Sequence, residues 1–193
     1  TTFKYLIMGK LIVISAPSGA GKTSIVHYLL KNMPELSFSI SACSREKRAE
    51  EIDGHDYYFL GIDGFKNKIK EDAFLEWEEV YSNQFYGTLN SELEKIWSKG
   101  NCAIFDVDVI GGINIKKKYP KECMSILIEP PSIGDLDKRL SARDSDSSSS
   151  IKERISKAKD EMSKKQFFDY VVLNDDFSIA CRETLDLVRT FLS

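Results

Sequence analysis

The run Leu11-Ile12-Val13-Ile14-Ser15 leads directly into the loop Ala16-Pro17-Ser18-Gly19-Ala20-Gly21-Lys22-Thr23, and this stretch decides the fold. A continuous apolar run rich in β-branched residues, ended by Pro and Gly, predicts a strand buried on both faces of a parallel sheet. After the loop, apolar side chains recur at helical spacing until Asn32 and Pro34, which predict the end of a helix. The expected order is therefore strand, loop, helix.

The loop follows the pattern G-x-x-x-x-G-K-[ST], with Ala16 in place of the first glycine. Its glycines let backbone N–H groups point at phosphate oxygens, and its lysine reaches the β and γ phosphates. An anion bound there would also lie at a helix N-terminus, which favours negative charge. A glycine-rich turn without chemistry is the competing interpretation. We predict a nucleoside triphosphate site made of Ala16, Pro17, Ser18, Gly19, Ala20, Gly21, Lys22, Thr23 and Ser24.

Two oxygen-bearing side chains predict a magnesium site beside this loop. Thr23 can offer its hydroxyl to Mg²⁺, and Asp106, near the end of the apolar run Cys102–Val107, is its expected acidic partner, directly or through water. Because many parallel strands end in Asp, a strand-end or helix-capping role for Asp106 stays open.

Apolar runs elsewhere predict further strands of the same sheet: Cys102–Val107, Ser125–Ile128 and Tyr170–Leu173, with amphipathic stretches between them. Strands separated by helices favour an α/β sandwich. Between Ser37 and Tyr86 the pattern changes to short segments such as Tyr57–Leu60 and Phe74–Trp77, which predict a small inserted lobe. The serine-rich tract at 143–150 is expected to be a mobile loop between helices.

Composition narrows the possible classes of protein. The 193 residues, 42% of them hydrophobic, favour a single domain spanning 1–193. A net charge of -3 argues against nucleic acid as a partner, and four cysteines without a CxxC pair argue against a zinc site or a disulfide framework. No apolar run approaches the roughly 20 residues that span a bilayer, so no membrane association and a cytoplasmic location are expected.

Four more motifs follow the loop in order. Ser41-Ala42-Cys43-Ser44-Arg45-Glu46-Lys47-Arg48 precedes Gly54-His55-Asp56-Tyr57; then come Glu76-Trp77 with Tyr86-Gly87-Thr88, then Asp106-Val107-Asp108, and a proline-led segment that ends in Arg139 and Arg143. Two arginine forks and a phenol can clamp one phosphate. Together these motifs resemble the guanylate kinase family, and the resemblance runs from Lys10 to about Phe191.

The resemblance implies an architecture and a reaction. The fold would be a three-layer α/β sandwich with a mainly parallel sheet, forming a core at about 8–36, 88–138 and 165–193, with a mixed α/β GMP-binding lobe at about 37–87 and a helical lid at about 139–164. The reaction would be the reversible, Mg²⁺-dependent transfer of the γ-phosphoryl group from ATP to GMP, and probably dGMP, by a monomer or weak homodimer in purine nucleotide metabolism.

The resemblance also implies individual roles. The GMP phosphate would be held by Ser41, Arg45, Arg48, Tyr57 and Tyr86, with Gly87 beside them, and guanine would be read by Glu76, Thr88 and Asp108. Guanine presents N–H donors at N1 and N2, so two carboxylates and a hydroxyl form a complementary set. The competing interpretations are an exposed strand residue for Glu76, core or surface aromatics for the tyrosines, and a solvated face for the arginines.

Lid and adenine roles complete the expected site. Arg139 and Arg143 are four residues apart, so a helix would set both on one face, and Arg154 lies beyond the serine tract. Such arginines can stabilise phosphoryl transfer, with ordinary surface charges as the alternative. Lys22 and Arg45 join them as the predicted catalytic residues. Asn174 and Asp175 resemble the family's adenine-side contact, with helix capping as the alternative.

Two other functions stay open at this stage. Guanylate-kinase-like domains also serve as peptide-binding scaffold modules, although these usually lose the working phosphate loop that is intact here. Another monophosphate kinase or a GTPase switch is disfavoured by Glu76, Thr88 and Asp108 and by the lack of an evident N-K-x-D motif.

Overall fold

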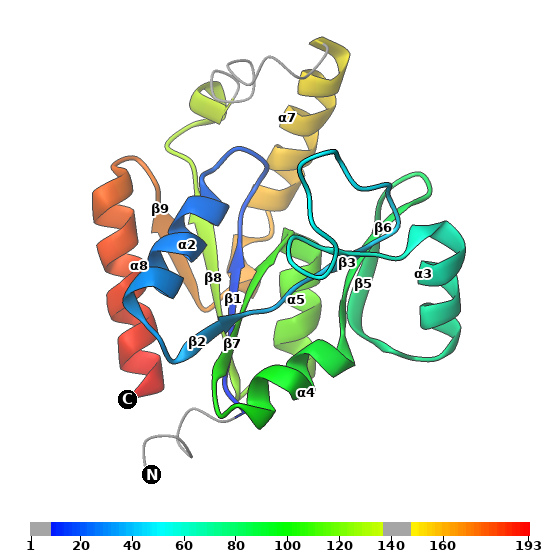
Figure 1. Cartoon of the computed structure of the whole chain (residues 1–193). Coiled ribbons are helices and arrows are strands. Elements are labelled where there is room, and N and C mark those ends of the chain that lie inside the picture. The colour runs from blue at the N-terminus through cyan, green and yellow to red at the C-terminus, as the bar shows by residue number, and fades with distance from the viewer. Residues whose placement is uncertain (1–8, 137–147) are drawn as a thin grey trace.

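The computed structural model describes residues 9–136 and 148–193, with side chains for 9–136 and 155–193. A five-stranded sheet, sheet A, forms its centre, in the order β2-β7-β1-β8-β9 (Figure 1). Every pair in it is parallel. Its strands are β1 (Leu11–Ser15), β2 (Leu36–Phe38), β7 (Cys102–Val107), β8 (Cys123–Glu129) and β9 (Tyr170–Leu173).

Helices cover both faces of sheet A, which confirms the three-layer sandwich. On one face lie α2 (Lys22–Asn32) and α8 (Phe177–Leu192), and on the other α4 (Asn90–Ser98) and α5 (Val109–Lys118) (Figure 1). Strand β1 shows why its sequence is apolar throughout. Ile12 and Ile14 pack in the core that includes residues of α2 and α8, whereas Leu11 and Val13 pack in the core that includes residues of α4 and α5.

A second sheet, sheet B, stands beside the core in the order β4-β3-β6-β5. Its strands are β3 (Ala42–Cys43), β4 (Tyr58–Phe59), β5 (Phe74–Tyr81) and β6 (Gln84–Leu89), and α3 (Gly61–Lys70) packs against it (Figure 1). The sheet is mixed, as expected for the inserted lobe. Phe65 of α3 stacks on Phe74 and Phe85, with ring centroids 4.4 and 5.6 Å away.

Helix α7 (Ser148–Met162) and the short 3-10 helix η1 (Lys165–Phe167) follow in the chain. Helix α7 lies at the same end of the molecule as the loop between β1 and α2 (Figure 1). The expected mobile loop at 143–150 is wrong for Ser148–Ser150, which begin this helix, whereas 143–147 lie outside the described residues. Arg139 and Arg143 also lie outside them, as does the side chain of Arg154.

Two strands of sheet A differ from expectation. Strand β2 was missed, although it pairs with β7 and brings residues 37 and 38 into the core sheet. Strand β9 has the expected bounds, but only Val172 of its four residues is buried, because β9 is an edge strand. Its Val-rich sequence therefore does not indicate burial on both faces.

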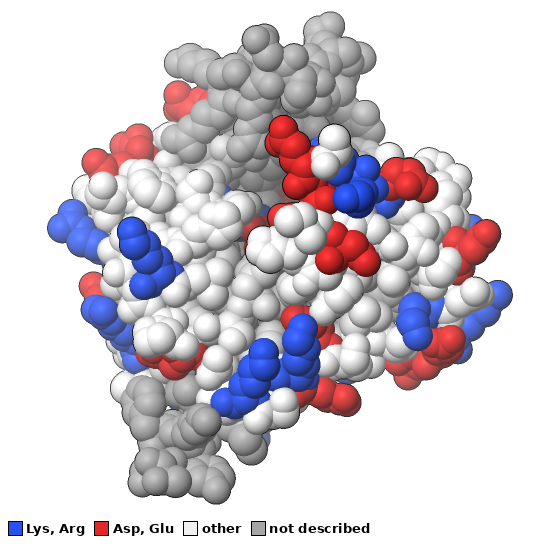
Figure 2. Space-filling view, in the orientation of Figure 1, with Lys and Arg blue, Asp and Glu red and all other residues white. Residues whose placement is uncertain are grey.

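The surface is mixed in charge. Figure 2 shows Lys and Arg interspersed with Asp and Glu on the face in view. Within residues 9–136 and 148–193, no helix is long and apolar enough to cross a membrane.

Replacing Ile14 with Ala should lower the free energy of unfolding by about 2–5 kcal/mol, because it leaves a cavity in the central strand. Ile14 is fully buried. Urea denaturation would measure the loss, with Ile52→Ala as the control because Ile52 is 61% exposed. Equal losses in the two variants would contradict the placement of the core.

Candidate active site

The phosphate-binding loop has the backbone that anion binding requires. Gly19 and Gly21 take φ values of 89° and 91°, where other residues are strained, and Gly21 is the N-cap of α2. Among residues 9–136 and 148–193, the non-glycine residues with positive φ are Asp72 and Asn83. Ala16 therefore replaces glycine without backbone strain.

Asp106 joins the loop to strand β7. The parallel register sets Ile14 beside Asp106, so the carboxylate lies near the carboxyl ends of the strands, where the loop leaves β1. Asp106 Oδ2 accepts a hydrogen bond from Thr23 Oγ1 at 2.7 Å, and Oδ1 lies 2.6 Å from Lys22 Nζ. Lys22 Nζ also donates to the Val107 carbonyl at 2.8 Å. The structure thus brings Thr23 and Asp106 into direct contact.

These oxygens suit a magnesium ion. In the described part of the chain, no three His, Cys, Asp or Glu side chains are grouped as a metal site. Mg²⁺ in nucleotide sites is bound through one or two protein oxygens and completed by phosphates and water. The Thr23 hydroxyl and the Asp106 carboxylate offer two oxygens of this kind.

One cleft of about 410 Å³ brings the two predicted halves of the site together. It lies between the loop, sheet B and α7. The predicted residues that line it are Ala16, Pro17, Ser18, Gly19, Ala20, Gly21, Lys22, Thr23, Ser24, Ser41, Tyr57, Glu76, Tyr86, Gly87, Asp106 and Asp108. A phosphate loop and a set of carboxylates therefore share one cavity.

Glu76 and Asp108 meet over Gly111. A Cβ on Gly111 would lie 3.0 Å from Glu76 Oε2 and 3.1 Å from Asp108 Oδ1, so glycine leaves space between two carboxylates. Asp108 Oδ1 also accepts from the Gly111 N–H at 2.7 Å and so caps α5. Thr88 is fully buried and does not line the cleft; it donates to Glu76 Oε1 at 2.9 Å. Thr88 thus holds Glu76 in place.

Burial raises the pKa of the Glu76 carboxyl to about 7, and the neighbouring charge of Asp108 acts in the same direction. The Thr88 hydrogen bond opposes the shift. A carboxyl group with this pKa changes its charge near neutral pH, so the ability of Glu76 to accept hydrogen bonds in the cleft depends on pH.

The predicted phosphate clamp lies at the edge of the cleft. The Arg45 guanidinium stands 5.1 Å from the centre of the Tyr57 ring, and the Tyr57 and Tyr86 rings are 6.0 Å apart. Burial raises the pKa of Tyr57 to about 12, so its hydroxyl stays a hydrogen-bond donor. Arg45 does not itself line the cleft, and Arg48 is exposed on the same loop.

Asn174 and Asp175 are also outside the cleft lining. Asn174 is buried, and its Nδ2 donates to the Ala20 carbonyl at 2.7 Å. A Cβ on Gly21 would lie 2.5 Å from that nitrogen, so glycine is required for this close approach. Asp175 is exposed, and Asp176 is the residue that caps α8, through the Ile179 N–H. Asn174 therefore holds the phosphate loop through the Ala20 carbonyl, without lining the cleft.

Four polar lining residues were missed from the sequence: Glu78, Tyr81, Lys157 and Glu161. Lys157 Nζ lies 3.8 Å from Glu161 Oε1 and 5.4 Å from the centre of the Tyr81 ring, so α7 contacts the tip of sheet B. Burial raises the pKa of Glu161 to about 7. Alternate residues of a β-strand point to the same face, so the position of Glu78 two residues after Glu76 could have predicted that Glu78 also faces the cleft.

Comparison with known proteins identifies relatives along almost the whole chain. The family model described as guanylate kinase matches residues 8–190. A guanylate kinase of Bacteroides thetaiotaomicron is 47% identical, over 96% of this chain and 91% of its own. One of Porphyromonas gingivalis is 46% identical, over 96% and 100%. The crystal structure of guanylate kinase from Anaplasma phagocytophilum has a TM-score of 0.77 at 27% identity, covering 95% of this chain and 86% of that one.

Asn174→Ala should weaken ATP binding by about tenfold, because the Ala20 carbonyl loses its buried donor and the loop loses its fixed shape. Titration calorimetry with ATP would measure this. Asn101→Ala is the matched control, since Asn101 Nδ2 donates to Ser37 Oγ at 2.8 Å, in the contact that joins β2 to the start of β7. Unchanged ATP affinity in Asn174→Ala would contradict the support that we assign to Asn174.

Proposed function

This chain belongs to the guanylate kinase family, and we propose that it transfers the γ-phosphoryl group of ATP reversibly to GMP, giving ADP and GDP. One observation carries the proposal: a phosphate-binding loop and the paired carboxylates Glu76 and Asp108 line the same cleft. The first half suits a triphosphate donor, and the second suits the N–H edge of guanine.

On the donor side, the backbone N–H groups of the loop and the N-terminus of α2 would bind the phosphates of ATP. Lys22 would bridge the β and γ phosphates, and Asn174 would keep the loop in shape. We also propose that Mg²⁺ is held by Thr23 and Asp106 together with the phosphates. When bound, the ion would neutralise charge on the donor phosphates.

On the acceptor side, the phosphate of GMP would lie among Ser41, Arg45, Arg48, Tyr57 and Tyr86. Guanine would donate from N1 and N2 to the Glu76 and Asp108 carboxylates, and Thr88 would orient Glu76. Adenine has no proton on N1 and would leave Glu76 without a donor. A site whose buried polar groups lose their partners can discriminate by roughly 10⁴.

The transfer needs positioning more than proton chemistry. An acceptor phosphate oxygen is largely ionised near neutral pH, so no general base is required. Arginines that approach the moving group stabilise the charge on its equatorial oxygens, worth roughly 10³ or more in rate. By family resemblance we assign this role to Arg139, Arg143 and Arg154. Closure of the lid around both substrates would exclude water and prevent hydrolysis of ATP.

The remaining parts of the proposal concern the enzyme's setting. We propose a monomer or weak homodimer in the cytoplasm, with dGMP as a second acceptor and no nucleic-acid partner. The net charge of -3 supports the absence of a nucleic-acid partner, and the scattered cysteines support a reducing compartment.

An acceptor panel tests the proposed reaction. With ATP and Mg²⁺, we expect ADP formation with GMP and dGMP and little with AMP, CMP or UMP. Lys22→Ala should nearly abolish turnover, and Glu76→Gln should narrow the preference for GMP over AMP. A scaffold module would bind neither ATP nor GMP tightly. Purified protein that forms no ADP in response to GMP would refute the proposal.

The affinity for the guanine base should fall as the pH falls, because base reading needs Glu76 ionised and burial raises its pKa to about 7. The dissociation constant of guanosine should rise about tenfold from pH 8 to pH 6. Guanosine is the right probe because it has no phosphate group to titrate in this range. Competition binding would measure the effect, and Glu76→Gln should remove it. If the guanosine affinity of Glu76→Gln still fell with falling pH, another titrating group would be responsible.

A further inference from the structure

Glu51 is an acidic residue within a loop whose neighbouring cations are expected to hold a phosphate. Its carboxylate forms two parallel hydrogen bonds with the Arg45 guanidinium: Nη1 donates to Oε2 at 2.7 Å and Nη2 to Oε1 at 2.5 Å. Both side chains are 17% exposed. This bidentate geometry fixes the plane as well as the position of the guanidinium.

The same residue closes the turn that carries the second arginine. Glu51 Oε2 accepts from the Arg48 backbone N–H at 2.8 Å, and the Glu51 N–H donates to the Arg48 carbonyl at 3.1 Å. Lys47 Nζ donates to the Glu51 carbonyl at 3.0 Å. One carboxylate therefore connects the side chain of Arg45 with the backbone of Arg48.

The pair also leaves Arg45 able to bind a ligand. A guanidinium has five N–H donors, and the bonds to Glu51 and to the Glu46 carbonyl use three of them. The Tyr86 side chain, which lines the cleft, also hydrogen-bonds with the guanidinium. The rings of Tyr57 and Phe59 lie 5.1 and 5.3 Å from its central carbon. Hydrogen bonding to Arg45 lowers the pKa of Glu51 to about 2, so the pair stays charged at neutral pH.

We propose that Glu51 is the positioning residue of the acceptor-phosphate site: its carboxylate holds Arg45 and the Arg48 turn in the arrangement that a phosphate monoester needs. This inference rests on the proposed function, because it takes these arginines as the GMP phosphate site. A site ordered before binding avoids the entropy cost of ordering two long side chains when the ligand arrives.

A competing role for Glu51, as a stand-in for the phosphate, predicts the opposite change in GMP affinity. If the carboxylate of Glu51 occupied the place of the phosphate, GMP would have to displace it, and removing it would tighten GMP binding. The hydrogen bonds to the backbone of Arg48 favour a structural part of the loop over a displaceable stand-in, because displacement would open the turn as well.

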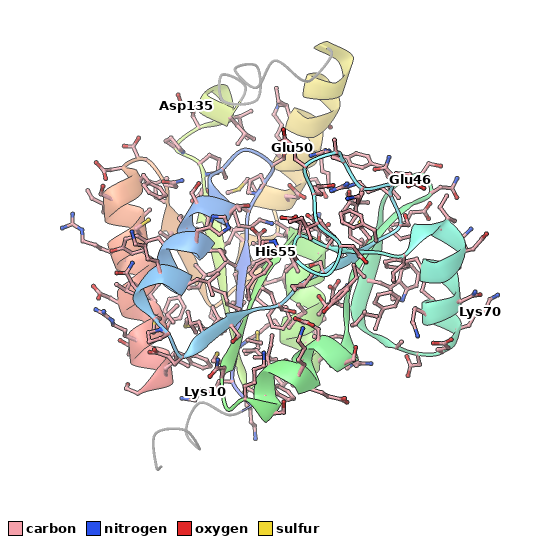
Figure 3. The ribbon with its side chains drawn as sticks, viewed as in Figure 1. Lys10, Glu46, Glu50, His55, Lys70 and Asp135 are labelled. Carbon is pink, nitrogen blue, oxygen red and sulfur yellow. The ribbon has the colours of Figure 1, made fainter. Side chains whose placement is uncertain are left out.

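The test compares a ligand that has the phosphate with one that lacks it. Dissociation constants for GMP and guanosine would be measured with Glu51→Ala, Glu51→Gln and the control Glu50→Ala. Glu46 and Glu50 lie on the same loop (Figure 3), and both are exposed. Glu51→Ala should weaken GMP binding by about tenfold and leave guanosine within about twofold. Glu51→Gln, which keeps one acceptor oxygen, should lose less, and Glu50→Ala should match the wild type for both ligands.

Three results would overturn the assignment: GMP affinity that is unchanged in Glu51→Ala, affinity that increases, or equal losses for GMP and guanosine, which would indicate general damage to the lobe. ATP affinity is the internal control and should not change. Wild-type protein that binds neither GMP nor guanosine would refute the proposed function, and this assignment with it, whereas normal binding by the wild type confines a failure to Glu51.

Discussion

The parallel pairing of β1 with β7 is the constraint on which the site depends. Ile14 of β1 lies opposite Asp106 of β7. The strand that leads into the phosphate loop and the strand that carries the acidic partner therefore end side by side. The Asp106 carboxylate can then bind Lys22 and Thr23 together. Helices cover both faces of sheet A, and the loop leaves from the carboxyl end of β1, next to Asp106.

The acceptor half is built by a different principle. Sheet B does not pair with sheet A in the described residues; its strand β5 carries Glu76 and Glu78 to the cleft, while Asp108 caps the N-terminus of α5 on the core side. Gly111 lets the two carboxylates approach each other, and buried Thr88 sets the direction of Glu76. The proposed recognition of the base therefore depends on contact between sheet B and the core, whereas the residues of the phosphate loop are consecutive in the sequence.

Features that lie within a few consecutive residues could be predicted from the sequence. Contacts between residues far apart in the sequence could not. The apolar runs of β1, β7 and β8 and the glycines of the loop identified the core because each is contained in a few consecutive residues. Strand β2 has three residues and no pattern of its own. The exposure of β9 follows from its place at the sheet edge. Lys157 and Glu161 reach the cleft only because α7 folds over it, and Glu51 gains its contacts from the turn around Arg48.

The central claim is that one cleft holds donor and acceptor nucleotides at the same time. Titration with a bisubstrate analogue, in which adenosine and guanosine are joined through their 5′ oxygens by a polyphosphate chain, tests this directly. If both halves bind in one cleft, the analogue should bind at least about 10²-fold more tightly than ATP or GMP alone, because the second half binds intramolecularly. An analogue that binds no more tightly than the better of the two nucleotides would contradict a shared site.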